Sequence, residues 1–506
     1  MPYSAIDIGS YETVMKIVEV KEKDIEYIEE AKKVIPIGRE AFLNQKIEVE
    51  SIQRICETLE GFKHLMQEYG VDKYKIVATS AFREASNRYY LIDQIQRCTG
   101  LDVTIISNSH EKYLMFKAAK AFVTSQFQLE PKKTPLIFLN IGYGNVQVTL
   151  VTDKGMIFNQ GYKIGSLRIL EVLADLEKKT INFTQVVDEY IESYIDSIPI
   201  NWNLFNGGGL IVYGREIQWM VELIGGQMEY DYDKITERIK QSKKGKNTWI
   251  VQHPAIDSDK IELLLPTLLI IDKFLKKGKS KKIYFPNIDL VDGMIKEYHE
   301  QKILKLDVET KDEDLLSYVR AIGEKYQYQK KHADYVEAIS LMLFDCTKKL
   351  HGIKKDRLLL QIATILHDIG KFISPNHHYD NTYKLIEATD IPGISEEERE
   401  IIAYVAKFHG GEWPETDPGY ELLTPKTKLR IAKLASIITI ANALDQSHQQ
   451  KIKNVTIKLK NNQLLIKGSA KQETVLEQWI FEERKALMEN VYGISVQLEM
   501  DTKVEQ

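Results

Sequence analysis

Four side chains in the second half of the sequence are of the types that bind a divalent metal. His332 comes first, His367 and Asp368 are adjacent, and Asp445 follows later in the chain. Imidazoles and carboxylates that converge from separate helices hold a divalent ion, which activates water and polarises a phosphoryl oxygen. Adjacent residues on a helix point about 100° apart, so His367 and Asp368 reach one ion only over their shared edge. The set therefore predicts one bound ion, with Mn, Fe or Mg as candidates.

The order of these residues resembles the HD superfamily of metal-dependent phosphohydrolases. Lys371, in the run His-Asp-Ile-Gly-Lys, is placed to contact phosphate. Three more histidines are candidates for a second ion or for the substrate: His377, His378 and His409. The alternative interpretation is that these polar groups only hydrogen-bond within a helical core.

Two glycine turns in the first half of the sequence have the form of phosphate-binding turns. The first is Asp7-Ile8-Gly9-Ser10, and the second is Asn140-Ile141-Gly142-Tyr143-Gly144-Asn145. A carboxylate at the end of a strand can hold a hydrated ion, and the backbone N–H groups that follow can bind phosphate. Besides Asp7, the residues expected at phosphate are Gly9, Ser10, Gly142, Gly144 and Asn145.

Several segments resemble the exopolyphosphatase/guanosine-pentaphosphate phosphatase (Ppx/GppA) family, in the family's order. AIDIGSYETVMKIVEV and FLNIGYGNVQVTLV are similar to its two phosphate motifs, and ATSAFREASN is similar to its arginine signature. IISNSHEKYLMF resembles the segment that carries the catalytic glutamate, and GYKIGSLRILE resembles the stretch after the second motif. LLLQIATILHDIGKFISPNHHYDNTYKLIE and LRIAKLASIITIANALDQSHQQKI are similar to the family's HD-like domain. The resemblance covers nearly the whole chain.

This resemblance implies roles for two residues. Arg83 would bind substrate phosphate, and Glu111 would be the general base that aligns the attacking water. A planar guanidinium binds phosphate oxygens in pairs, which suits Arg83. Without the resemblance, both residues would be interpreted as surface charges at the start of helical regions.

The second phosphate motif departs from the family at five positions, which are Asn140, Tyr143, Asn145, Val146 and Gln147. The family has Asp-Ile-Gly-Gly-Gly-Ser-Thr-Glu, and its two acids help to place the metal and the water. This chain has Asn140 and Gln147 in place of those acids, and Tyr143 in place of the central glycine. Each amide keeps the size of the acid and removes its charge. Without these acids the metal would neutralise less of the phosphoryl charge, which would cost several kcal/mol of transition-state stabilisation. We therefore call Asn140, Tyr143 and Gln147 degenerate positions.

The hydrophobic pattern predicts the elements that position these residues. Strand, glycine turn and strand begin near Ala5 and again near Leu136, and a helix is expected from Ala81 to Cys98. Residues 311–448 predict almost continuous helix. The tail predicts a hairpin around Asn461-Asn462, then a helix and a last strand.

Together these patterns predict a multidomain α/β plus all-α protein. We expect two actin/Hsp70-like (ribonuclease H-like) ATPase-fold domains at residues 1–125 and 126–305. A helical HD-type domain at 306–450 and a small α+β domain at 451–506 would follow. The two α/β halves have the form expected of distant duplicates.

Composition narrows the class of protein. The 506 residues are 43% apolar and 28% charged, as in globular proteins, and no apolar run approaches the length that spans a bilayer. There is no basic leader, and the three cysteines form no zinc or disulfide pattern. A net charge of -5 argues against general nucleic-acid binding. We expect a cytoplasmic bacterial protein with no nucleic-acid or membrane partner.

The favoured function is release of phosphate from inorganic polyphosphate or guanosine pentaphosphate by a metal-aligned water, with Mg beside Asp7. The sequence therefore favours an enzyme. Two alternative functions stay open. In one, the degenerate first site binds such a polyanion as a regulator without turnover. In the other, the HD site is the phosphohydrolase and the first half regulates it. The family resemblance implies a homodimer.

Overall fold

The computed structural model describes residues 2–22, 24–177, 179–243, 258–302 and 313–502. The chain divides into two compact units, residues 1–306 and 307–506, each with a fold of its own. Among the described residues, no helix combines the length and the apolar composition needed to cross a membrane.

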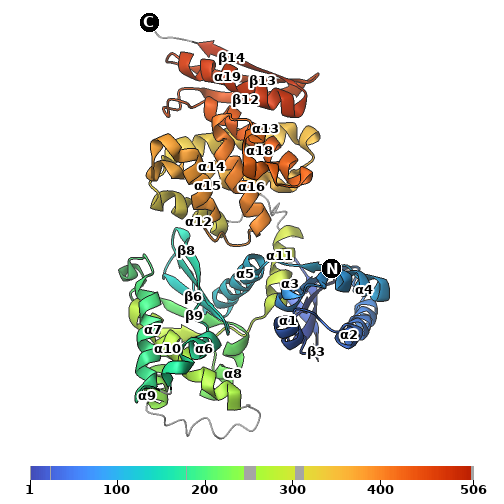
Figure 1. Ribbon diagram of the computed structural model, residues 1–506, viewed down its shortest axis with the longest axis vertical. Coiled ribbons are helices and arrows are strands. Elements are labelled where there is room, and N and C mark those ends of the chain that lie inside the picture. Colours follow the sequence, from blue (N-terminus) through green and yellow to red (C-terminus); the bar gives the residue numbers. More distant parts are fainter. Residues whose placement is uncertain (1, 23, 178, 244–257, 303–312, 503–506) are drawn as a thin grey trace. The chain divides into compact units, whose positions relative to one another are not determined.

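A five-stranded sheet lies at the centre of the first half of unit one (Figure 1). Its strands are β1 (Pro2–Ile8), β2 (Glu12–Val20), β3 (Ile25–Val34), β4 (Lys73–Ala78) and β5 (Val103–Ile105), in the order β3-β2-β1-β4-β5. The strands β3, β2 and β1 are antiparallel, whereas β4 and β5 run parallel to β1. Nearly every residue of β1 and β2 is buried, because helices cover both faces of the sheet.

The two faces of this sheet have separate apolar cores. One face packs against α1 (Gly38–Asn44), α2 (Val49–Glu68), α3 (Ser80–Glu84) and α4 (Arg88–Thr99). The other packs against α5 (Asn108–Phe127) and α11 (Leu290–Lys302). In this second core Leu290, Met294 and Ile295 of α11 join Tyr3 and Val14 of the sheet. A helix distant in sequence thus completes the first sheet.

The second half of the unit repeats this arrangement around a six-stranded sheet. Its strands are β6 (Leu136–Ile141), β7 (Val146–Thr152), β8 (Gly155–Tyr162), β9 (Gly209–Tyr213), β10 (Glu229–Asp231) and β11 (Lys282–Tyr284), in the order β10-β11-β9-β6-β7-β8. The strands β8, β7 and β6 are antiparallel, and β9 and β11 follow in parallel, as β4 and β5 do in the first sheet. This repeated topology supports the interpretation of the halves as distant duplicates.

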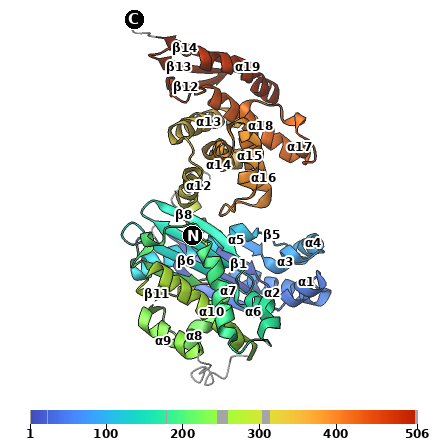
Figure 2. The same cartoon turned by 60° about the vertical axis from the view of Figure 1, so that its left-hand side comes forward.

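Helices also enclose the second sheet. They are α6 (Ser166–Glu177), α7 (Phe183–Asp196), α8 (Arg215–Ile224), α9 (Tyr232–Lys243) and α10 (Ser258–Gly278), with a 3-10 turn, η1 (Trp202–Phe205). Figure 2 shows α7 beside α10, where Lys273 binds Asp188 at 2.7 Å and Glu192 at 2.8 Å. The strands and the inner faces of these helices form one large buried cluster.

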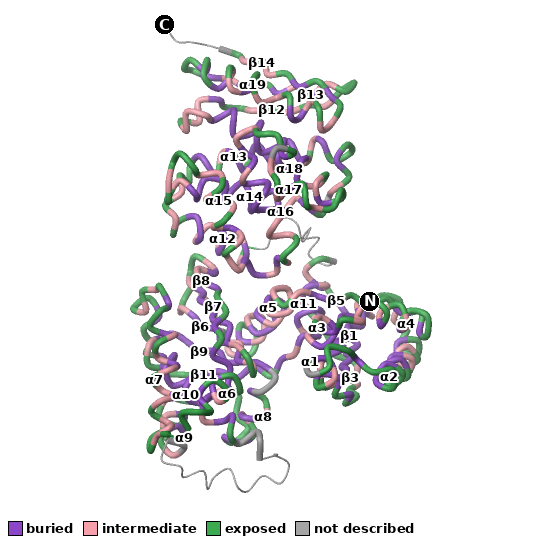
Figure 3. Tube along the Cα trace, in the orientation of Figure 1, coloured by how far each residue is buried: buried purple, intermediate pink, exposed green. Residues whose placement is uncertain are grey.

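Unit two begins with a helical region. Its helices are α12 (Glu313–Lys325), α13 (Lys330–His351), α14 (Arg357–Leu366), α15 (His378–Glu387), α16 (Glu396–Lys407), α17 (Pro418–Glu421) and α18 (Pro425–Ala443). Short 3-10 turns join them: η2 (Lys354–Asp356), η3 (Ile369–Phe372), η4 (Pro375–His377), η5 (Phe408–Gly410) and η6 (Pro414–Thr416). Figure 3 shows much of α14 and α18 in purple, as buried residues, because other helices of unit two surround both.

A three-stranded sheet and one helix end the chain. The elements are β12 (Lys453–Lys460), β13 (Gln463–Ala470), α19 (Val475–Tyr492) and β14 (Ser495–Thr502). The predicted hairpin is present, and both turn residues, Asn461 and Asn462, have positive φ (50° and 58°). Asparagine tolerates this left-handed conformation, which matches the twist of a two-residue hairpin.

The coarse prediction of α/β structure followed by helices is confirmed, but one local expectation was wrong and one strand was missed. The sequence analysis did not include β3, whose residues are mostly exposed, so its alternation is weak. The helix expected from Ala81 to Cys98 is two helices. Between them the N–H of Ser86 donates to the carbonyl of Gln45 at 2.8 Å, and Asn87 bonds to the backbone of Ile47. Contacts with a distant loop thus replace the helical hydrogen bonds.

A buried ion pair between α11 and the first sheet makes the stability of unit one depend on pH. Glu297 accepts a hydrogen bond from Lys75 at 2.8 Å and lies 3.4 Å from His110. Burial opposes its ionisation, but these partners outweigh burial and lower the pKa of Glu297 to about 2. A carboxyl group whose pKa is lower in the folded state than in the unfolded state stabilises the fold at pH values above the unfolded pKa. That stabilisation is lost as the pH falls through the folded pKa, here about 2.

We therefore expect wild-type unit one to lose up to roughly 3 kcal/mol of stability through this group between about pH 5 and pH 2. The variant Glu297→Gln should lose less over the same range, because the amide does not titrate. Denaturant unfolding at a series of pH values measures both. Glu300→Gln, on the same helix and paired with Lys117, is the matched control. Identical pH profiles for wild type and Glu297→Gln would contradict the assignment.

Candidate functional site

Three parallel strands of the first sheet end at one edge and position the first predicted site. Ile8, Ala78 and Ile105 are register partners at these carboxyl ends. Asp7 is buried one residue before the end of β1, and the turn from Gly9 follows it. Because the carboxyl ends of neighbouring parallel strands share one edge, the segments after β4 and β5 lie beside this turn.

Those two segments bring the predicted catalytic pair into contact. Nη1 of Arg83, in α3, donates to Oε2 of Glu111 at 2.8 Å and to the carbonyl of Ile106 at 3.0 Å. The hydroxyl of Ser107 caps α5 by accepting from the N–H of His110 at 3.1 Å, which fixes the turn that carries Glu111. The side chains of the pair are 21% and 27% exposed, so solvent reaches them. Among the described residues, Oε1 of Glu111 has no hydrogen-bond partner.

The two predicted phosphate turns are structural equivalents. The N–H of Gly9 donates to the carbonyl of Glu12, and the N–H of Gly142 donates to the carbonyl of Asn145, both at 2.9 Å. Each turn joins the first and second strands of its sheet with the same register. The second turn is open to solvent at Tyr143, a residue that is 42% exposed.

Two glycines pack directly against the second turn. A Cβ atom on Gly165 would lie 2.3 Å from the carbonyl oxygen of Tyr143 and 2.4 Å from the nitrogen of Asn145. A Cβ atom on Gly214 would lie 2.2 Å from the carbonyl oxygen of Ile141, and its φ is 137°. Only glycine allows so close an approach of backbone to backbone. These contacts hold the second turn in place.

The two amides of the second phosphate motif lie opposite each other, and one of them contacts a lysine. Asn140 and Gln147 are register partners in β6 and β7, and Nζ of Lys112 donates to Oε1 of Gln147 at 3.2 Å. The equivalent partners in the first half are Asp7 and Val14. One half therefore keeps a carboxylate, and the other presents two amides with an ammonium group. The sequence analysis missed Lys112, although it directly follows Glu111.

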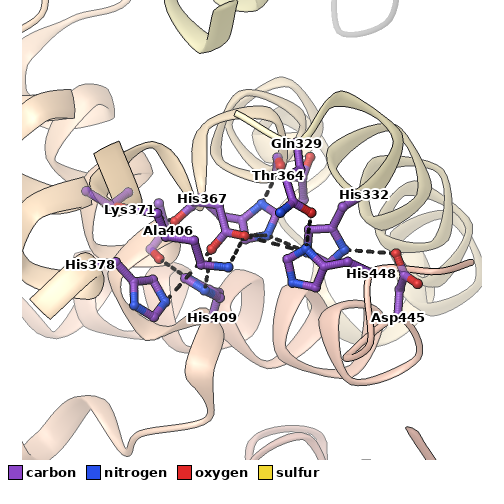
Figure 4. Close-up of polar contacts among 12 residues, drawn as sticks. Gln329, His332, Thr364, His367, Lys371, His378, Ala406, His409, Asp445 and His448 are labelled. Carbon is purple, nitrogen blue, oxygen red and sulfur yellow. Dashed lines mark hydrogen bonds and ion pairs between the residues drawn. The ribbon is translucent and has the colours of Figure 1, made fainter. Parts of the chain in front are cut away.

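The second predicted site lies in the helical region, where five histidines point Nδ1 at an oxygen acceptor (Figure 4). The Nδ1 partners are Oδ2 of Asp445 for His332 (2.9 Å), the carbonyl of Thr364 for His367 (2.7 Å), the carbonyl of Pro375 for His378 (2.8 Å), the carbonyl of Ala406 for His409 (2.6 Å) and Oε1 of Gln329 for His448 (2.6 Å). Since these oxygens accept hydrogen bonds, Nδ1 carries the proton in each ring. In the neutral ring Nε2 is then free to bind a metal.

Asp368 lies among these Nε2 atoms. Its Oδ2 is 3.8 Å from Nε2 of His332 and 3.7 Å from Nε2 of His367, and these two nitrogens are 3.1 Å apart. Its Oδ1 is 3.4 Å from Nε2 of His409 and 3.8 Å from Nε2 of His378. Ligand atoms of His332, Asp368 and His448 lie within 4.8 Å of one another, as do those of His367, Asp368 and His409.

Charge and burial set the protonation of this cluster. Burial lowers the pKa of His367 well below its ordinary value, and burial with the charges of His332 and Lys371 lowers that of His448 to about 4. Burial opposes the charge of Asp368, but the neighbouring His367 and His409 hold its pKa well below the ordinary value. Nζ of Lys371 also donates to Oδ2 of Asp368 at 2.5 Å. Asp368 is therefore ionised, and burial disfavours the charged form of His367 and of His448, so both rings are suited to bind a metal in the neutral form.

Asp445 is near this cluster without facing Asp368. Its Oδ2 accepts from Nδ1 of His332 and from Nε2 of Gln450 (2.7 Å), and its Oδ1 accepts from the N–H of Gln450 (2.6 Å). In this arrangement Asp445 orients His332. The structure thus brings together three of the four residues predicted to bind the ion. The fourth, Asp445, is hydrogen-bonded to the Nδ1 side of His332.

The sequence analysis missed His448 and included a histidine that lies elsewhere. His448 follows α18 in a left-handed conformation and stacks on His332 with ring centroids 3.7 Å apart. Its place near the predicted ligand Asp445 was the available signal. His377 is exposed and makes no contact with the cluster among the described residues. The other two extra candidates, His378 and His409, lie in the cluster.

Comparison with known families identifies the class of protein. Residues 14–301 match the Ppx/GppA phosphatase family, and residues 316–486 match Ppx/GppA phosphatase, domain III. The chain belongs to the Ppx/GppA phosphatase family.

Curated relatives are distant. A bifunctional 3-dehydroquinate synthase/phosphatase of Fusobacterium nucleatum is 27% identical over 248 residues, which are 46% of this chain and 35% of that protein. The match thus spans about a third of that relative. A guanosine-5'-triphosphate,3'-diphosphate pyrophosphatase of Pseudoalteromonas translucida is 23% identical over 423 residues, 80% of each chain.

Solved structures of the family are also similar to this chain. The Ppx/GppA family member of Aquifex aeolicus is 18% identical, with a TM-score of 0.47 over 60% of this chain and 99% of that one. An exopolyphosphatase from Cytophaga hutchinsonii gives the same identity, coverage and TM-score.

Proposed function

We propose that the first site hydrolyses terminal phosphoanhydride bonds of inorganic polyphosphate or of a guanosine polyphosphate. The observation that carries the proposal is the contact between Arg83 and Glu111 at the edge that also bears Asp7 and the first turn. Membership of the family supports a phosphatase, and the similarity to a guanosine-5'-triphosphate,3'-diphosphate pyrophosphatase of Pseudoalteromonas translucida supports a guanosine polyphosphate as substrate.

In this proposal Glu111 accepts a proton from the attacking water through Oε1, while Arg83 holds Oε2 in place. The resulting hydroxide attacks the terminal phosphorus, and the bond to the bridging oxygen breaks. The shortened chain leaves with that bond's electrons. The two turns bind phosphate through the backbone N–H groups that follow Gly9 and Gly142.

The residues at the first site can hold a magnesium ion that takes most of its ligands from the substrate. Mg²⁺ is often held by one or two carboxylates together with substrate phosphates, and it neutralises charge on the transferred phosphoryl group. Asp7 supplies one carboxylate, whereas Asn140 and Gln147 add none. An ion here would depend on the substrate for its other ligands, with Asp7 as the residue that holds it.

Phosphate release tests the proposal directly. Purified protein with Mg²⁺ should release phosphate from polyphosphate or from guanosine pentaphosphate, and the ratio of kcat/KM for the two names the substrate. Binding of either without release would instead favour a regulator. The contact of Lys112 with Gln147 supports that second candidate, because amides stand where the family places metal-holding acids and the site carries less negative charge.

Both candidates share an expectation for Lys112. Because Lys112 places an ammonium group beside Gln147, Lys112→Met should raise the Kd for polyphosphate by roughly tenfold, the loss of one charge-assisted hydrogen bond. The ratio of the variant's Kd to the wild-type Kd should be smaller at high salt, because salt screens the charge of Lys112. Titration of fluorescent polyphosphate at two salt concentrations measures this. Lys132→Met, at an exposed loop position, is the control, and an equal change there would refute a specific role for Lys112.

A further inference from the structure

Two of the three cysteines meet where helices α2 and α4 of the first unit pack together. Cys56, in α2, is buried at 8% exposure, and Cys98, in the last turn of α4, is exposed. Their thiol groups are in hydrogen-bonding contact. Spacing along the chain indicated no disulfide, because residues 57–97 separate the two cysteines. The fold thus pairs thiols that the sequence pattern left apart.

The packing of the two helices places these thiols together independently. Cys56 belongs to the apolar core beneath the first sheet, and so does Ile95 of α4. Cys98 follows Ile95 by three residues and therefore lies on the same side of α4. Nζ of Lys63, in α2, donates to the carbonyl of Thr99 at 2.6 Å, which holds the end of α4 against α2. The helix pair therefore keeps one thiol in the core and the other at its rim.

We propose that Cys56 and Cys98 are a site of reversible oxidation and form a disulfide when the protein reacts with a peroxide. The cysteine that reaches solvent reacts first, and its buried neighbour completes the bond. Thiols already in contact need only side-chain rotation and a small approach of the two helices to reach bonding distance.

The reaction takes two steps. The sulfur of Cys98 attacks one oxygen of hydrogen peroxide, an S–O bond forms, the O–O bond breaks, and water leaves with the thiol proton. Cys98 is now a sulfenic acid, and the peroxide has taken up two electrons. The sulfur of Cys56 then attacks the sulfur of Cys98, the S–O bond breaks, and a second water leaves with the proton of Cys56. Two thiols and one peroxide thus give one disulfide and two waters.

The environment of Cys56 fixes this order. Burial, with smaller contributions from Cys98 and from the carboxylates of Glu60 and Glu57, raises the pKa of the Cys56 thiol to about 11. Cys56 therefore keeps its proton at neutral pH, and its burial keeps the oxidant away. The second step needs the thiolate of Cys56, so its rate should rise about tenfold for each pH unit below that pKa.

The bond would close a covalent loop around part of the first site. Residues 57–97 contain β4 and α3, and α3 carries Arg83. A cross-link that closes a loop restricts the unfolded chain and so stabilises the folded state. Oxidation should therefore raise the denaturant concentration at which unit one unfolds. A lower midpoint would show that the bond forms only by distorting the packing of α2 and α4, and would overturn the assignment.

Thiol titration and peptide mapping of the full chain test the proposal. Reduced protein should have three free thiols after unfolding, since the sequence has three cysteines. After hydrogen peroxide only one should remain, and digestion without reductant should yield a linked pair of peptides that contain Cys56 and Cys98. Dithiothreitol should restore all three. Three thiols after peroxide, loss of thiols without the linked pair, or a bond between the Cys98 residues of two chains would overturn the proposal.

Variants assign the role of each cysteine. Cys98→Ser, at an exposed position, should form no bond, and its unfolding midpoint should not change with peroxide. Cys56→Ala should leave Cys98 as a sulfenic acid that dimedone captures, and circular dichroism shows whether this core variant is folded. Cys346→Ser is the matched control, because Cys346 contacts the carbonyl of Ile457 in unit two. Loss of the bond in this control would refute the pairing.

Discussion

The variant Glu111→Gln should lose phosphate release by about 10²–10⁴-fold while its Kd for polyphosphate changes little. An amide cannot accept the proton of the attacking water, but it keeps the size of the side chain. Its oxygen can still accept the hydrogen bond from Arg83, so the local structure should persist. Steady-state phosphate release and equilibrium binding on the same preparation give kcat and Kd separately.

Glu84→Gln provides the matched control for this measurement. Glu84 follows Arg83 in α3 and is exposed, so removal of its charge should leave kcat unchanged. Full activity of Glu111→Gln would rule out Glu111 as the base. Residual release that disappears only when Asp368 is also changed would instead locate the activity at the histidine cluster.

Gly165→Ala should destabilise the first unit although it adds only one methyl group. Its Cβ would lie within 2.4 Å of three backbone atoms in the turn from Gly142 to Asn145. Backbone cannot rotate away as a side chain can, so the turn must shift, at a cost of about 1–3 kcal/mol or more. We expect a lower Tm and at least tenfold weaker phosphate binding.

Gly144→Ala is the control for this change, because it adds the same methyl group within the same turn. A Cβ atom there meets nothing within 4 Å, and Gly144 has no positive φ. Near-normal Tm and binding are therefore expected. If the two variants behave alike, the turn is not held by Gly165.

Local patterns predicted the parts of the fold that local chemistry determines. The turns at Asp7 and Asn140 follow runs of buried strand residues, and the hairpin at Asn461-Asn462 uses residues that tolerate positive φ. The break between Ala81 and Cys98 was not predictable in this way. It depends on hydrogen bonds to residues 45 and 47, which are remote in sequence.

The candidate sites show the same limit. The order of His332, His367 and Asp368 in the sequence indicated a metal site, and the structure clusters them. The sequence could not show which nitrogen of each ring faces inward, so it could not separate a ligand from a residue that orients one, as at Asp445. The contact of Lys112 with Gln147 joins α5 to the second sheet, and no local pattern encodes it.

The return of α11 to the first sheet has a consequence for any attempt to divide the protein. A fragment that ends after α5 would retain every strand of the first sheet but would leave the face around Tyr3 and Val14 without the apolar side chains of residues 290–295. Such a fragment should aggregate when made alone and become soluble when residues 128–302 are supplied as a second chain. On this account the two halves should fold only together, although each has its own sheet.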